Sequence, residues 1–134
     1  MLGNFPLIVV SLAIYNMVAF LTPGVGWGDP LYTVRMVSGA EWTITLGNAL
    51  VALTVIFLFF EMVKAARPSS HSIYDHLLST LVFVAALVEF LLVREAGTSV
   101  FAILVLIAFV DVIGGWSISV RTARRDLMIE PSAE

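Results

Sequence analysis

One acidic side chain, Asp111, lies near the middle of a stretch from residue 96 to residue 120 that carries no other charged residue. An ionised carboxylate is costly to bury in hydrocarbon without a basic partner, so such a group is protonated, hydrogen-bonded or bound to a cation. By sequence position, we expect no Lys or Arg at the matching depth of another hydrophobic segment. The residue types therefore allow proton or cation handling, and they equally allow a polar contact that holds helices together.

Three further polar side chains lie inside hydrophobic segments, namely Asn16, Asn48 and Glu89. Counting from the outer ends of the predicted helices places these three at one level, roughly 8–12 Å deep, and Asp111 at roughly 18 Å. One hypothesis makes Glu89 and Asp111 a proton- or cation-handling pair, with both asparagines as neutral oxygen ligands. The other makes all four side chains hydrogen-bonding groups that specify helix packing or an oligomer interface, and this is the commoner role of asparagine in membrane helices.

The composition requires lipid as the solvent for most side chains. Hydrophobic residues make up 60% of the 134 residues, which is more than a soluble domain of this length can bury. The net charge is −3, and the only cluster of basic residues is Arg121, Arg124 and Arg125, so nucleic acid is not an expected partner. The chain has no cysteine, which excludes disulfides, thiolate catalysis and cysteine-ligated metal centres.

Four hydrophobic stretches separated by turn-rich segments predict an all-α fold, a bundle of four antiparallel transmembrane helices in one integral membrane domain of residues 1–134. The predicted helices span about 5–21, 39–66, 73–96 and 99–125, with a long outer loop at 22–38. The second helix is predicted to begin at residue 39 because Ser38 and Glu41 have the spacing of a capping box. Within the loop, residues 31–37 fit either a short interfacial helix or a strand.

The basic residues predict the orientation. With four spans, the two termini and the 67–72 turn share one side of the membrane, which would carry Lys64, Arg67, Arg121, Arg124 and Arg125, while the other side would carry Arg35 and Arg94. The positive-inside rule then places both termini in the cytoplasm. The loop 22–38 would lie outside, where Trp27 and Tyr32 are typical of the headgroup level.

Small and polar residues form a stripe on each of the last two predicted helices, and the expected packing positions are Ser79, Ala86, Gly114 and Gly115. The glycine pair favours a close helix crossing, although two glycines can also loosen a helix and free carbonyls toward an ion. Lipid is expected to contact Phe57, Phe59, Phe83 and Phe90. Glu61 and Lys64 are expected to be solvated or interfacial charges at a helix end.

Two stretches, TVRMVSGAEWTITLGN and DHLLSTLVFVAALVEFLLV, resemble segments of a family of small four-helix membrane proteins in alphaproteobacterial genomes that has no characterised activity. The resemblance covers most of the chain. It implies a location in the bacterial inner membrane and nothing about chemistry.

The sequence contains no motif for hydrolytic, zinc-dependent or phosphate chemistry, so we expect no enzymatic activity and no cofactor. His71 and His76 are five residues apart and do not share a helix face, so we expect no metal site. The preferred function is that of a homo-oligomer or an accessory subunit of a membrane complex, with the lipid bilayer and a membrane protein as partners. The alternative is a small proton- or cation-linked transporter or channel that uses the intramembrane carboxylates.

Overall fold

The computed structural model describes residues 5–66 and 72–129. These residues form four helices, a short 3-10 helix and a two-stranded hairpin. In chain order the elements are α1 (Ile8–Leu21), β1 (Pro30–Arg35), β2 (Glu41–Thr45), α2 (Leu46–Ala66), α3 (Ser72–Leu92), the 3-10 helix η2 (Arg94–Ala96) and α4 (Ser99–Ile129). The prediction of a mostly helical chain is therefore confirmed.

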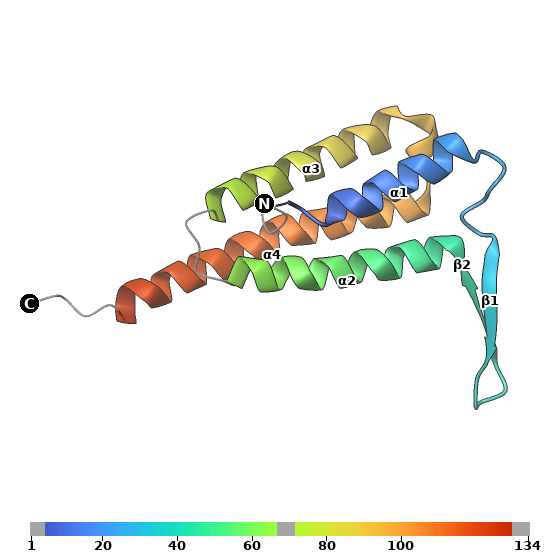
Figure 1. Ribbon diagram of the computed structural model, residues 1–134, viewed down its shortest axis with the longest axis horizontal. Coiled ribbons are helices and arrows are strands. Elements are labelled where there is room, and N and C mark those ends of the chain that lie inside the picture. Colours follow the sequence, from blue (N-terminus) through green and yellow to red (C-terminus); the bar gives the residue numbers. More distant parts are fainter. Residues whose placement is uncertain (1–4, 67–71, 130–134) are drawn as a thin grey trace, which may run out of the picture.

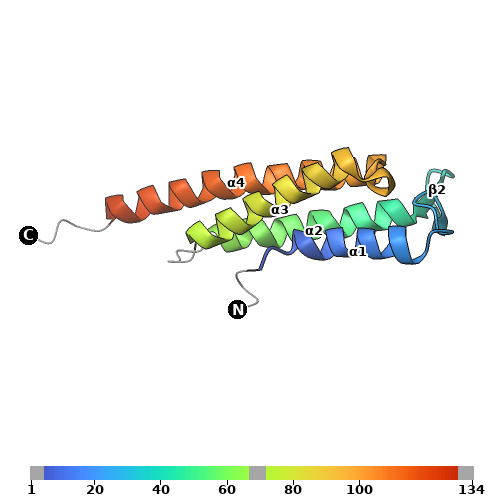
Figure 2. The same ribbon diagram turned by 90° about the horizontal axis from the view of Figure 1, so that it is seen from above.

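The helices run roughly along one common axis, and α4 is the longest of them (Figure 1). It makes its most extensive contacts with α2 and α3, while α1 lies against α2. At one end of the molecule α4 projects beyond α2 and α3, as both Figure 1 and Figure 2 show. The hairpin lies at the opposite end, close to the end of α1 and the start of α2.

Three helices in the described part of the chain are long and apolar enough to cross a membrane: Leu46–Ala66, Ile73–Leu92 and Ser99–Ile118. Their outward-facing side chains are large and apolar, as at Phe59, which is 63% exposed, and Leu92, which is 78% exposed. These features support an integral membrane protein. The fourth helix, α1, has 14 residues and a length of about 21 Å, which is shorter than the ~30 Å hydrocarbon layer.

The predicted start of the second helix is wrong. The structure begins α2 at Leu46, and residues 41–45 form strand β2 instead. Residues 36–40 make the hairpin turn, in which Gly39 has a φ of 92° and the Met36 amide donates to the Ala40 carbonyl oxygen at 2.7 Å. The run Trp42-Thr43-Ile44-Thr45 is rich in residues that favour strands, and its pairing with β1 outweighs the local capping-box pattern. The pairing also shows that the segment 31–37, which fitted either a short helix or a strand, is mostly strand, because most of it lies in β1.

The other helix boundaries differ from the prediction by a few residues. Helix α1 begins at Ile8 and not at residue 5, and α4 continues to Ile129, beyond residue 125. Helix α3 ends at Leu92 and not at residue 96, because Val93 takes an extended conformation before the 3-10 helix.

Of the four phenylalanines expected to face lipid, Phe59 is exposed and the other three, Phe57, Phe83 and Phe90, are partly buried. Phe83 lies 5.5 Å from Phe109 between ring centroids, and Phe90 lies 6.3 Å from Phe101. Both pack against the buried core, so the prediction for them is wrong. The helical repeat predicts on which side of α3 these two residues lie. How much of that side is covered by α4 depends on how α3 and α4 pack against each other.

Candidate functional site

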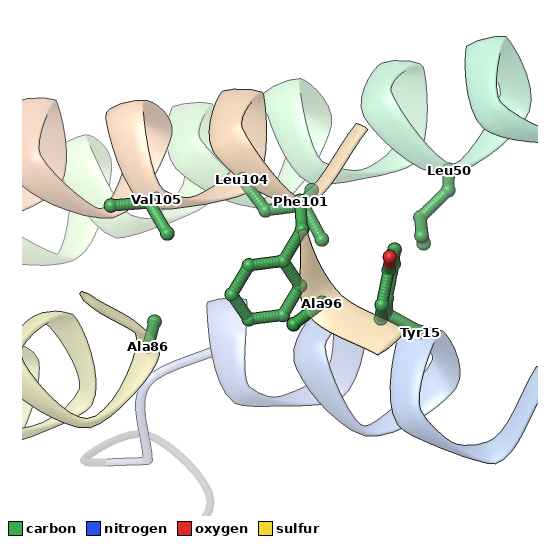
Figure 3. Packing of buried hydrophobic residues seen from close by; sticks show 7 residues of the cluster. All are labelled: Tyr15, Leu50, Ala86, Ala96, Phe101, Leu104 and Val105. Carbon is green, nitrogen blue, oxygen red and sulfur yellow. The ribbon is translucent and has the colours of Figure 1, made fainter. Parts of the chain in front are cut away.

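The hairpin end of the molecule is held by an aromatic cluster centred on Tyr15, which is fully buried. Its ring stacks on the Trp27 ring at 4.5 Å between centroids. It also packs edge-to-face with the Phe101 ring at 4.8 Å between centroids (Figure 3). The Tyr15 hydroxyl donates to the Glu95 carbonyl oxygen at 2.8 Å and lies 2.7 Å from the Thr98 hydroxyl oxygen. One side chain of α1 therefore fixes both the loop before β1 and the connection between α3 and α4.

Asn16 and Glu89, two of the four candidate polar residues, are brought into contact. Asn16 Nδ2 donates to Glu89 Oε1 at 3.3 Å and to the Leu12 carbonyl oxygen at 2.9 Å. Both side chains are partly buried between α1 and α3. The contact joins two helices that are far apart in the sequence.

A second interhelical hydrogen bond was not anticipated from the sequence. Thr54 on α2 donates from its hydroxyl to the Ser11 hydroxyl oxygen on α1 at 2.7 Å, and both side chains are fully buried. Hydroxyl groups are common in apolar helices because they can bond to their own backbone, and Thr54 Oγ1 also lies 2.7 Å from the Leu50 carbonyl oxygen. The residue types alone therefore did not single out this pair.

Asn48 does not join the other candidates. Its side chain is exposed in the first turn of α2, where Asn48 Oδ1 accepts from the Thr45 amide and the Asn48 amide donates to Thr45 Oγ1, each at 3.1 Å. These two bonds form a capping box at the true start of the helix. The depth predicted for Asn48 was counted along a helix beginning at residue 39, whereas α2 begins at Leu46, two residues before Asn48.

Asp111 is 5% exposed and belongs to a different group of polar side chains. The Ser79 side chain on α3 hydrogen-bonds its carboxyl group, and Glu61 and Lys64 on α2 interact with it electrostatically. We call these four residues the Asp111 cluster. The acidic neighbour of Asp111 is therefore Glu61, while Glu89 is bound to Asn16 on α1.

Glu61 is 6% exposed, so its prediction as a solvated or interfacial charge is wrong. Its Oε1 accepts from the Leu7 amide at 3.0 Å and from Lys64 Nζ at 2.9 Å. Lys64 Nζ also donates to the Phe5 carbonyl oxygen at 2.8 Å. The first amides of a helix have no partner within the helix, and here α2 supplies one to the start of α1. The spacing of Glu61 and Lys64 in the sequence indicates that they could form an ion pair, but it does not indicate the contact between Glu61 and the Leu7 amide.

The glycine pair of α4 lies against the other helices of the same chain. A Cβ atom at Gly114 would lie 3.0 Å from Met62 Sδ, and one at Gly115 would lie 3.3 Å from His76 Cε1. The helix continues through both glycines, so they serve a close crossing and leave its backbone hydrogen bonds intact. His76 is buried and stacks on Trp116 at 4.9 Å between ring centroids.

The remaining predicted packing positions also face the interior, since Ser79 and Ala86 are both buried. Beside His76, Asp75 Oδ1 is buried and has no hydrogen-bond partner among the residues that the structure describes. His71 lies outside the described residues. The polar groups of α3 thus lie on the same side of the helix as its small residues.

Chemically, the Asp111 cluster combines two carboxyl groups, an ammonium group and a hydroxyl group in a largely apolar setting. Such a set can hold three helices together, and carboxyl groups in this setting can also exchange a proton or bind a cation. The Asn16–Glu89 contact has one acidic group and lies between a different pair of helices. Comparisons of the chain with protein-family models, curated proteins and solved structures find no match.

Proposed function

We propose that this protein is a non-enzymatic integral membrane protein, a four-span antiparallel bundle with both termini in the cytoplasm, that works as a homo-oligomer or as an accessory subunit of a membrane complex. The observation that carries the structural role is that the polar side chains of the helices bond to one another. Ser11 bonds Thr54, Asn16 bonds Glu89 and Ser79 bonds Asp111, and each pair joins two helices. Side chains engaged in this way build a scaffold.

The sequence suggested association because a small bundle offers few partners for its polar groups. Because these polar groups bond to one another within the chain, they do not require a partner. The length of α4 supports a partner instead. Helix α4 has 31 residues, about 46 Å, and its end projects beyond α2 and α3 (Figures 1 and 2). Arg121 and Arg124 are exposed on this projecting part. A helix end without neighbours among residues 5–66 and 72–98 of its own chain is available to a second copy or to another subunit.

The topology can be tested with reporter fusions at the N-terminus, at residue 30 and at residue 134. We expect the N-terminal and C-terminal reporters in the cytoplasm and the reporter at residue 30 on the opposite side, because the Lys and Arg distribution favours this orientation. The N-terminal fusion is the decisive one, since α1 is the shortest helix. An N-terminal reporter on the same side as residue 30 would mean that α1 does not cross and that the protein has three spans.

Association can be tested by native mass spectrometry and by cross-linking in membranes at low protein-to-lipid ratio. We expect either more than one copy of the chain or a co-purifying membrane protein in constant ratio. A variant that ends at residue 118 removes the projecting part of α4 while keeping the span Ser99–Ile118, and it should lose the association. Phe59→Leu, on the exposed face of α2, is the matched control and should retain it. A full-length chain that is monomeric and alone in its native membrane contradicts the proposal.

A second candidate function, proton or cation transport, is favoured by one observation. Asp111 and Glu61 are both buried and interact with each other, with Lys64 beside them. Charged groups inside a membrane protein commonly mark an ion or proton path. The pair would be Asp111 with Glu61 and not Asp111 with Glu89, and the test of this pair is given in the Discussion.

A further inference from the structure

The hairpin has two chemically different faces. Side chains alternate along a strand, so the register assigns Tyr32, Val34, Trp42 and Ile44 to one face, which we call the apolar face. The other face, the polar face, carries Thr33, Arg35, Glu41 and Thr43. Within the polar face, the two threonine hydroxyl oxygens are 3.1 Å apart. On the apolar face, Tyr32 is 68% exposed and Trp42 is 53% exposed, so none of the residues that the structure describes covers them.

The hairpin lies where a membrane span begins. Strand β2 ends at Thr45, and the candidate span starts at the next residue, Leu46. The strands run roughly perpendicular to the helices (Figure 1). If the helices cross the bilayer, the strands run along its surface at the level of the headgroups.

The direction of the hairpin is fixed at its base. The Leu46 amide donates to the Asp29 carbonyl oxygen at 3.0 Å, and the Gly47 amide donates to the Trp27 carbonyl oxygen at 2.9 Å. The Trp27 ring in turn stacks on Tyr15. A Cβ atom at Gly47 would lie 2.7 Å from Val100 Cγ2 and 3.1 Å from the Trp27 carbonyl oxygen, so a larger residue at this position would force its neighbours to move. The hairpin therefore keeps its angle to the helices.

We propose that the hairpin is a membrane-interface element whose apolar face rests in the boundary between headgroups and acyl chains, with its polar face in water. An isolated two-stranded hairpin is marginally stable in water, and burial of one face in the interface stabilises it. Trp and Tyr are the residues that favour this level of a bilayer, and the hairpin carries one of each on the apolar face. The inference rests on the membrane-spanning orientation proposed above.

The test uses single cysteines, because the native chain contains none. Tyr32→Cys and Trp42→Cys report on the apolar face, while Thr33→Cys and Thr43→Cys are the matched controls on the polar face. Each full-length variant is labelled with a nitroxide and placed, one copy per disc, in lipid nanodiscs without other protein. Collisions with oxygen, which concentrates in lipid, are compared with collisions with a water-soluble nickel chelate. We expect several-fold lower nickel accessibility, and higher oxygen accessibility, on the apolar face than on the polar face.

A label at Ile56→Cys, on an exposed position of α2, separates this inference from the proposal on which it rests. Nickel access at position 56 would contradict the membrane span itself. Protection at position 56 with equal nickel access to both hairpin faces would overturn the hairpin proposal alone. An apolar face that is nickel-accessible in nanodiscs but protected in native membranes would also overturn it, because a protein would then cover this face.

Discussion

Replacing Tyr15 by alanine is expected to lower the free energy of unfolding by about 3–5 kcal/mol. The ring is fully buried and contacts Trp27 and Phe101, so its removal leaves a cavity that rigid helix ends cannot close. The hydroxyl group also holds the turn between α3 and α4 through Glu95 and Thr98. Unfolding of the purified protein in mixed micelles, followed by circular dichroism, measures the change.

Tyr15→Phe separates packing from hydrogen bonding. It keeps the ring contacts and removes the hydroxyl group, so we expect a loss of about 1 kcal/mol. Met17→Ala is the control on the same helix, because Met17 is exposed and should tolerate truncation. Equal destabilisation by Tyr15→Ala and Met17→Ala would contradict the assignment of Tyr15 to the core of the hairpin end.

Replacing Asp111 by leucine is expected to lower the free energy of unfolding by about 1–3 kcal/mol, because the buried Ser79 side chain loses its partner. Asp111→Asn keeps the size and hydrogen-bonding capacity and should have a much smaller effect. Adding Ser79→Ala to Asp111→Leu removes the unpaired hydroxyl group and should recover part of the loss. The same unfolding assay measures all three variants, and strictly additive effects of the two substitutions would contradict the Ser79–Asp111 contact.

The same position decides between scaffold and transport. Asp111→Asn cannot titrate, so a proton flux that depends on this carboxyl group should be lost in liposomes containing the variant. Glu61→Gln should act in the same direction if the two groups work as a pair. Glu89→Gln is the matched control, since Glu89 binds Asn16 and lies outside the Asp111 cluster. Flux that is unchanged by Asp111→Asn would exclude a proton-carrying role and leave the scaffold proposal.

The helices were the part of the fold that could be predicted best. In lipid, the backbone amide and carbonyl groups of a long apolar stretch must hydrogen-bond to each other within the segment. Hydropathy alone therefore indicates helices of membrane-spanning length. It could not place the start of α2, because Ser38 and Glu41 have capping-box spacing in a segment that forms a hairpin turn and strand β2. A strand is stabilised by pairing, and the partner of β2 is a separate segment of the chain.

The contacts of the buried polar side chains were likewise predictable only in part. The sequence alone predicts that Asn16 and Glu89 lie at one level of the bundle, because helical rise converts residue number into distance, and the structure has these two side chains in contact. The packing of the helices, which the sequence did not predict, places Asp111 with Ser79 and Glu61 and brings Glu61 to the Leu7 amide, 54 residues away in the sequence. The physical reason is that helical periodicity is a local property, whereas the pairing of buried polar groups depends on which helices are neighbours and on how each is rotated about its axis.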